Sequence, residues 1–140
     1  MLFSKTDNVY KIARITGAQN NILGIEFMTD DDFNNKIEVI ECNLWNMGRS
    51  KIKGSKEEIL KQVLEGLKRI NQRLGTKYKF SRIYFSPFDL PYNKVYACLT
   101  IYLITHYHTG ETFKETSKTS FSPEIIDNEI FTINYKNYIS

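Results

Sequence analysis

The stretch "SKEEILKQVLEGLKRINQRLG", residues 55–75, decides the fold. Ser55 and Glu58 form the capping-box pattern that is typical of a helix start, and Gly75 is placed to end the helix in the left-handed conformation. Spacings of three and four residues, the period of one helix face, separate Ile59, Val63, Leu67, Ile70 and Leu74. The pattern predicts one amphipathic helix over about 55–75 whose apolar face packs on another layer.

The chain before this helix predicts strands. Residues 8–15 ("NVYKIARI") and 22–28 ("ILGIEFM") are rich in β-branched and aromatic side chains, and a turn-forming "TGAQNN" separates them. Residues 36–45 ("KIEVIECNLW") alternate between apolar and polar side chains, as a half-buried strand does. The polar stretch "TDDDFNN", residues 29–35, predicts a loop.

The chain after the helix predicts strands again. Residues 77–85 ("KYKFSRIYF") alternate, with one face expected to carry Tyr78, Phe80, Arg82 and Tyr84. Residues 94–108 are dense in β-branched and aromatic side chains, which favours a long strand over a helix. "TG" at 109–110 predicts a hairpin turn into a strand over 111–120. Beyond it we expect a short helix over 122–129 and a last strand or ordered tail over 130–139.

The expected strand 94–108 has two different faces. The odd positions from Val95 to Leu103 are apolar and are expected to pack on the helix. The even positions include Tyr96 and Tyr102, and tyrosine is favoured at protein interfaces. This second face is therefore either a partner-binding surface or a surface that the C-terminal tail covers.

The order of these elements predicts one α+β domain over residues 1–140. We expect an antiparallel twisted sheet with the long helix on one face. A chain of 140 residues with 41% hydrophobic residues is large enough for one core. No apolar run approaches the roughly 18 residues that span a bilayer, and the N-terminus lacks the apolar segment of a secretory signal. With only Cys42 and Cys98, the chain is expected in the cytoplasm.

The charges are unevenly distributed along the chain. Residues 49–82 hold eleven basic and three acidic side chains, a net charge of +8, whereas the remainder holds eight basic and thirteen acidic, a net charge of −5. The basic segment suits an anionic partner. If that partner is a nucleic acid, the candidate contacts are Arg49, Lys51, Lys53, Lys68, Arg69 and Arg73.

Two sequence features could indicate a metal site, and neither has the ligands or the spacing that such a site needs. His106 and His108 lie two residues apart in "HYHTGE", but they are the only histidines, and a zinc site needs three or four ligands. Asp30, Asp31 and Asp32 are consecutive, whereas a calcium loop spaces its acids by one residue. We interpret the histidines as a solvated strand end. The aspartates form either a solvated loop or an acidic patch for a basic partner. No metal or cofactor is expected.

The chain also lacks the motifs of common enzymes. It has no G-x-S-x-G, no C-x-x-C and no glycine-rich phosphate loop. Its size, its bias toward Ile, Lys and Asn, and its α+β order resemble the small immunity proteins of bacterial toxin–immunity pairs, such as those of contact-dependent growth inhibition. The resemblance implies a protein that neutralises a cognate toxin by covering its active site.

Three hypotheses about function follow from the sequence. The favoured one is a non-catalytic protein-binding inhibitor that uses Asp30, Asp31 and Asp32 or the tyrosine face. The second is a nucleic-acid-binding module that uses the basic segment 49–82. The third is a small ligand-binding or enzymatic pocket on the sheet.

Overall fold

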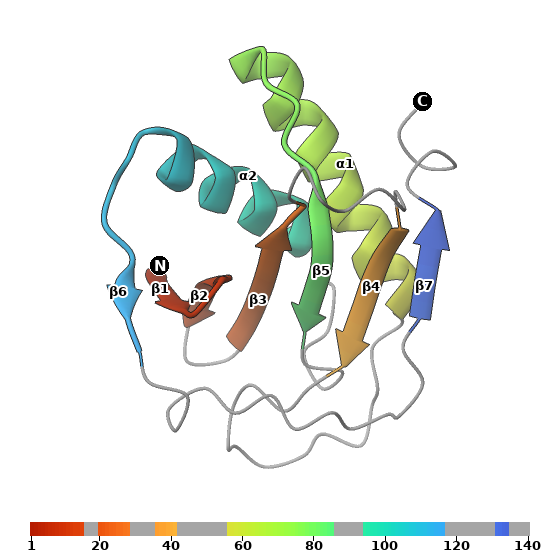
Figure 1. The fold of residues 1–140 in the computed structure, drawn as a ribbon, viewed down its shortest axis with the longest axis horizontal. Coiled ribbons are helices and arrows are strands. Elements are labelled where there is room, and N and C mark those ends of the chain that lie inside the picture. The colour runs from red at the N-terminus through yellow and green to blue at the C-terminus, as the bar shows by residue number, and fades with distance from the viewer. Residues whose placement is uncertain (16–19, 29–35, 42–55, 86–93, 117–130, 135–140) are drawn as a thin grey trace.

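The computed structural model describes residues 1–15, 20–28, 36–41, 56–85, 94–116 and 131–134. The elements in chain order are β1 (Leu2–Thr6), β2 (Val9–Ile15), β3 (Asn20–Phe27), β4 (Lys36–Glu41), α1 (Lys56–Leu74), β5 (Phe80–Phe85), α2 (Val95–His108), β6 (Lys114–Glu115) and β7 (Phe131–Asn134). The strands form one sheet in the order β6-β1-β2-β3-β5-β4-β7. Both helices lie on the same side of it (Figure 1), which confirms the α+β class.

The sheet is mixed, not purely antiparallel. The pairs β1–β2, β2–β3, β3–β5 and β4–β7 are antiparallel, as predicted. The pairs β4–β5 and β1–β6 are parallel. Helix α1 connects β4 to β5, and such a long crossover returns the chain to the end of the sheet from which β4 began. The single long helix therefore makes a parallel pair inside a mainly antiparallel sheet.

Helix α1 confirms the helix predicted over 55–75. Its apolar stripe is buried from Ile59 to Ile70, and Leu74 packs on the edge of the core. Gly75 adopts a φ of 68°, and the N–H of Thr76 donates to the carbonyl of Asn71 at 3.0 Å. This bond is the mark of a Schellman helix end. The predicted cap Ser55 lies outside the described residues.

The prediction of a long strand over 94–108 is wrong, because residues 95–108 form helix α2. Three buried pairs of side chains recur every four residues: Val95 and Tyr96, Leu99 and Thr100, Leu103 and Ile104. The run is so apolar that it fits the periods of both a strand and a helix, and packing on α1 and the sheet decides between them. None of the described helices is long and apolar enough to cross a bilayer.

Other boundaries also differ from the sequence predictions. Thr109 and Gly110 end α2, so they do not form a hairpin turn. Of the strand expected over 111–120, the described part contains only β6, and β7 confirms part of the last strand. The predicted loop 29–35 and the predicted helix 122–129 lie outside the described residues.

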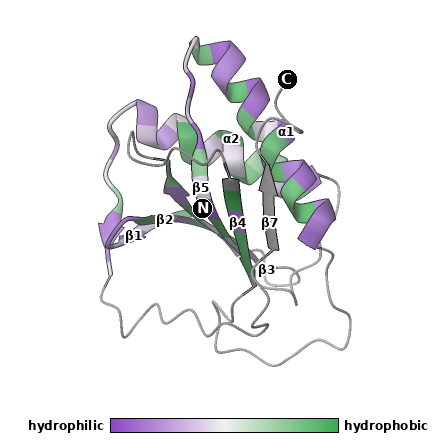
Figure 2. Ribbon diagram, turned by 45° about the vertical axis from the view of Figure 1, so that its right-hand side comes forward, coloured by the Kyte–Doolittle hydropathy of each residue, from purple (hydrophilic) through white to green (hydrophobic). Residues whose placement is uncertain are grey.

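The core lies between the sheet and the two helices. It includes the fully buried side chains Ile12, Leu23, Ile25, Val39, Ile83, Leu67 and Tyr96. Figure 2 shows hydrophobic colour on the strands that face the helices and alternating colours along α1, as an amphipathic helix requires. A second, smaller cluster of Val9, Ile40 and Tyr84 lies apart from this core.

Candidate functional site

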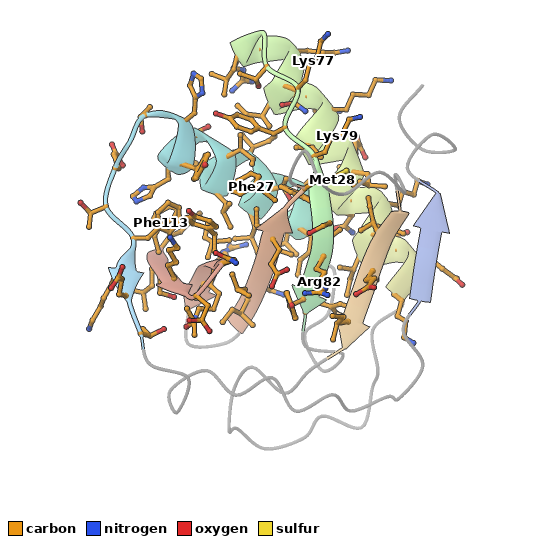
Figure 3. All side chains as sticks on the ribbon, in the orientation of Figure 1. Phe27, Met28, Lys77, Lys79, Arg82 and Phe113 are labelled. Atoms are coloured by element: carbon orange, nitrogen blue, oxygen red, sulfur yellow. The ribbon has the colours of Figure 1, made fainter. Side chains whose placement is uncertain are left out.

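The main candidate site is a hollow of about 370 Å³ beside the end of β3. It is lined by residues from β2, β3, β4, β5 and α2, and by Asn8 of the β1–β2 turn. Figure 3 shows two of these residues, Phe27 at the end of β3 and Arg82 on the neighbouring β5. The volume is near the lower end of the roughly 300–1,000 Å³ that small-ligand sites enclose.

The local strand pairing creates this hollow. The β2–β3 ladder ends at the pair Tyr10 and Ile25, so the last residues of β3 extend past it. On the other side of β3, the β3–β5 register shifts between Glu26 and Phe27. Bulges of this kind re-aim side chains, and they are common next to functional sites. Here Ser81 is the extra residue of β5, and residues from both sheet faces reach one hollow.

The bulge also corrects the face predicted for residues 77–85. Phe80 was expected beside Arg82 and Tyr84, but it lies in the main core with Ile83. The two core residues are three positions apart because the extra residue Ser81 breaks the alternation. Arg82 and Tyr84 remain on the other face of the sheet, away from the helices.

The polar side of the hollow is an ion-paired chain across three strands. The guanidinium of Arg82 donates from Nε to Glu38 Oε2 at 2.9 Å and from Nη1 to Glu26 Oε2 at 3.1 Å. The hydroxyl of Tyr84 donates to Glu26 Oε1 at 3.1 Å. The hydrogen bond with Glu38 is the main cause that raises the pKa of Arg82. Burial, with help from Glu26, raises the pKa of Tyr84 to about 12.

The two carboxylates of this ion-paired group differ in exposure and in how many of their oxygens described residues bond. Both oxygens of Glu26 accept a hydrogen bond, and its side chain is only 19% exposed. Glu38 is 38% exposed, and its Oε1 accepts no hydrogen bond from a described residue. Two carboxylates surround one guanidinium, so the lining of the hollow has a formal charge of −1. Both carboxylates share the charge of Arg82, and Glu38 is the more exposed of the two.

The other side of the hollow is a wall of packed aromatic rings. The ring of Phe27 lies 4.4 Å from that of Tyr107 and 5.4 Å from that of Tyr10, between centroids. Tyr10 and Tyr107 meet edge to face at 5.1 Å. Burial raises the pKa of Tyr107. Neither tyrosine hydroxyl bonds to another described residue.

The predicted partner-binding residues are not brought together. Tyr96 is fully buried in the core, and its N–H donates to Gln62 Oε1 at 3.1 Å. Tyr102 is 51% exposed on α2. The shared sheet face that was expected to carry both tyrosines does not exist, because residues 95–108 form a helix. Asp30, Asp31 and Asp32 lie outside the described residues.

The structure places three of the predicted nucleic-acid contacts on the exposed side of α1. Lys68, Arg69 and Arg73 are all exposed there, and Arg69 pairs with Glu65 at 3.1 Å. The aromatic residues that follow in the sequence do not extend this surface, since Phe80 is in the core and Tyr84 is 7% exposed. The other predicted contacts, Arg49, Lys51 and Lys53, lie outside the described residues.

Both histidines lie in the last turn of α2, not at a strand end. His106 stacks on Phe3 with ring centroids 3.7 Å apart. Its Nδ1 lies 2.8 Å from Glu111 Oε2, and its Nε2 lies 2.8 Å from the carbonyl oxygen of Thr112. His108 Nδ1 bonds to the hydroxyl of Tyr78 at 2.8 Å. Among the described residues, no three His, Cys, Asp or Glu side chains gather as metal ligands.

Sequence reasoning missed the residues that form the hollow. Arg82 and Glu38 are 44 positions apart and meet because β4 and β5 are parallel neighbours. Tyr107 faces Phe27 because residues 95–108 form a helix. The alternating sequences of residues 36–41 and 80–85 did predict strands that carry Glu38 and Arg82. Only the pairing of these two strands shows that the two side chains meet.

Comparison with protein-family models, with curated proteins and with solved structures finds no match to this chain.

Proposed function

We propose that this protein is a non-catalytic inhibitor that binds a protein partner. In this proposal it acts like the immunity proteins of toxin–immunity pairs, by covering the active site of a toxin. The observation that carries the proposal is the hollow at the end of β3, which is lined both by an ion-paired group of net formal charge −1 (Glu26, Glu38 and Arg82) and by the rings of Phe27 and Tyr107.

The composition of the hollow suits a protein interface. Tyrosine and arginine are enriched among the residues that contribute most to binding energy. Arg82 is held by two carboxylates and Phe27 is packed between rings, so both are ordered before a partner arrives. Such ordering reduces the entropy cost of association. The negative lining also complements the basic active sites with which nucleases bind phosphates.

The same geometry gives less support to an enzymatic pocket. Paired catalytic carboxylates flank a substrate bond and exchange protons with it. In this hollow the Arg82 guanidinium occupies the space between Glu26 and Glu38. The two carboxylates therefore orient Arg82 and do not face each other across a substrate.

Nucleic-acid binding is also less supported than protein binding. The exposed bases of α1 offer contacts to phosphates. A single-strand binder also needs aromatic rings on which bases stack, and the rings of Phe80 and Tyr84 are buried. Retention of the protein on single-stranded DNA at physiological salt, lost in Lys68→Gln/Arg73→Gln, would favour this alternative.

The proposal places the protein in the cytoplasm. Cys98 is an exposed free thiol on α2. Thiols of this kind persist where glutathione and thioredoxin keep them reduced.

A growth-rescue experiment tests the proposed function. Each protein encoded beside this one in its source genome is produced in a bacterial host, with and without this protein. We expect one neighbour to stop growth, and we expect co-production of this protein to restore it. Leu67→Asp, which buries an unpaired charge in the core and should unfold the inhibitor, serves as the negative control. If no neighbour is toxic, or if none is neutralised, the proposal is wrong.

A further inference from the structure

We infer that the hollow receives a basic side chain of the partner, an arginine or a lysine. The inference rests on the proposed function, because it names the chemical group that the partner would insert. It follows from the charge, the aromatic wall and the size of the hollow.

The charge of the lining selects a cation. Arg82 is already bonded to Glu26 and Glu38, so its charge is balanced by carboxylates on both sides. An incoming anion would meet these two carboxylates at short range, which like-charge repulsion disfavours. A cation would instead meet Glu38 Oε1, which no described residue bonds, and would neutralise the remaining formal charge.

The aromatic wall favours the same group. A guanidinium or ammonium is attracted to the face of an aromatic ring, and guanidinium also stacks on it. The carbon stem of an arginine or lysine packs on apolar surface while its charged end stays polar. Phe27 and Tyr107 supply the ring surface, and the hydroxyls of Tyr10 and Tyr107 can accept N–H donors.

The size of the hollow suits one side chain. A volume of about 370 Å³ is small for a bulky cofactor, whose sites extend toward the upper end of the usual range. Its walls come from the ends of neighbouring strands and from the last turn of α2, which are fixed by the sheet and the core. One long, flexible side chain can enter such a hollow and position its positive charge near the carboxylate of Glu38.

The probe for this inference is Nα-acetyl-L-arginine methylamide, added to the ¹⁵N-labelled protein and followed by NMR. We expect saturable shifts at Tyr10, Phe27 and Arg82, with a dissociation constant in the millimolar range that suits one side chain. The neutral citrulline analogue should bind at least about fivefold more weakly, because it loses the ion pair.

Two matched pairs of variants locate the bound probe. Glu38→Gln should weaken binding about fivefold, whereas Glu57→Gln, the same change at an exposed acid of α1, should not. Tyr107→Leu removes a ring of the wall, and Tyr102→Leu removes an exposed ring elsewhere on α2. Only Tyr107→Leu should weaken binding. Glu38→Gln alters no core packing, so it tests the site even if Tyr107→Leu misfolds.

Other outcomes overturn the inference. If the arginine probe shifts no hollow residue, or if the citrulline analogue binds equally well, the hollow does not select a cation. If Nα-acetyl-L-glutamate methylamide binds there more tightly, Arg82 makes it an anion site.

The growth-rescue experiment separates this inference from the proposed function. Rescue that occurs although the arginine probe does not bind leaves the inhibitor function in place and rejects the basic side chain. Probe binding without any neutralised neighbour rejects the inhibitor function, and with it the assignment of the side chain to a toxin.

Discussion

Gly66 of α1 lies directly against the backbone of Ala97 of α2. A Cβ added at Gly66 would lie 2.5 Å from the carbonyl oxygen of Ala97 and 2.9 Å from its Cα. Because these are backbone atoms, neither can move aside by a change of rotamer. The helices therefore cross in contact at this point, and the crossing places α2, with Tyr107 in its last turn, over the sheet.

The first prediction is that Gly66→Ala destabilises the protein. Alanine in a helix interior normally stabilises by about 1 kcal/mol relative to glycine, but overpacking here should cost about 1–3 kcal/mol instead. Urea denaturation measures the difference. Lys61→Ala on the exposed side of α1 is the control and should change stability by less than about 0.5 kcal/mol. A Gly66→Ala variant as stable as the parent would show that the helices are not in contact here.

The second prediction concerns the core side of α1. Leu67 is fully buried in the main core, so Leu67→Ala should lower the free energy of unfolding by about 2–5 kcal/mol. Lys68→Ala, at the next position but exposed, should have little effect. Thermal melting of both variants checks this, and equal melting temperatures would mean that the buried face of α1 is assigned wrongly.

These two positions show why the fold was only partly predictable from the sequence. Leu67 belongs to a stripe with one clear period, so α1 was predicted within a residue or two. Residues 95–108 are apolar on nearly every side, so their period is ambiguous, and contacts such as Gly66 with Ala97 decide that they form a helix. The same long-range pairing hides the candidate site, since Glu38 and Arg82 meet only when β4 lies beside β5.

The third prediction uses the pH dependence of stability. Lys11 is 4% exposed, and its Nζ donates to the hydroxyls of Thr6 at 2.8 Å and Thr116 at 3.0 Å. Burial lowers the pKa of Lys11 to about 8 from its ordinary 10.5. Between these values the unfolded chain binds more protons than the folded one, so stability rises with pH. Below pH 8 Lys11 is charged in both states, so the full cost of burying its charged ammonium lowers the stability of the folded protein.

Replacing Lys11 by methionine should remove the part of the pH dependence of stability that comes from this lysine. The stability of the parent should therefore rise relative to Lys11→Met between about pH 8 and 10.5, by on the order of 3 kcal/mol at most. Urea midpoints measured across this range give the difference, and Lys61→Met is the control for an exposed lysine. A difference between parent and Lys11→Met that does not vary with pH would contradict the lowered pKa.

The fourth prediction is that His106 holds the segment leading to β6 against the sheet. Its ring stacks on Phe3 and contacts Glu111 and the carbonyl of Thr112. His106→Ala should therefore speed the hydrogen exchange of the Thr116 amide, which bonds to the carbonyl of Lys5 at 2.8 Å. His108→Ala, at the exposed end of the same helix, should not. Unchanged exchange at Thr116 in both variants would show that the histidine contacts do not order this segment.

The proposed binding of a toxin through the hollow is tested most directly by the dissociation constant of the complex with whichever neighbour this protein neutralises. Two charge reversals are compared with the parent: Glu38→Arg in the hollow and Lys68→Glu on the exposed side of α1. Glu38→Arg should weaken the complex at least about tenfold, which corresponds to about 1.4 kcal/mol, because it places a second cation where the basic side chain of the partner is proposed to enter. Lys68→Glu should leave the affinity nearly unchanged. A complex that tolerates Glu38→Arg but is lost with Lys68→Glu would contradict binding through the hollow and would place the interface on α1.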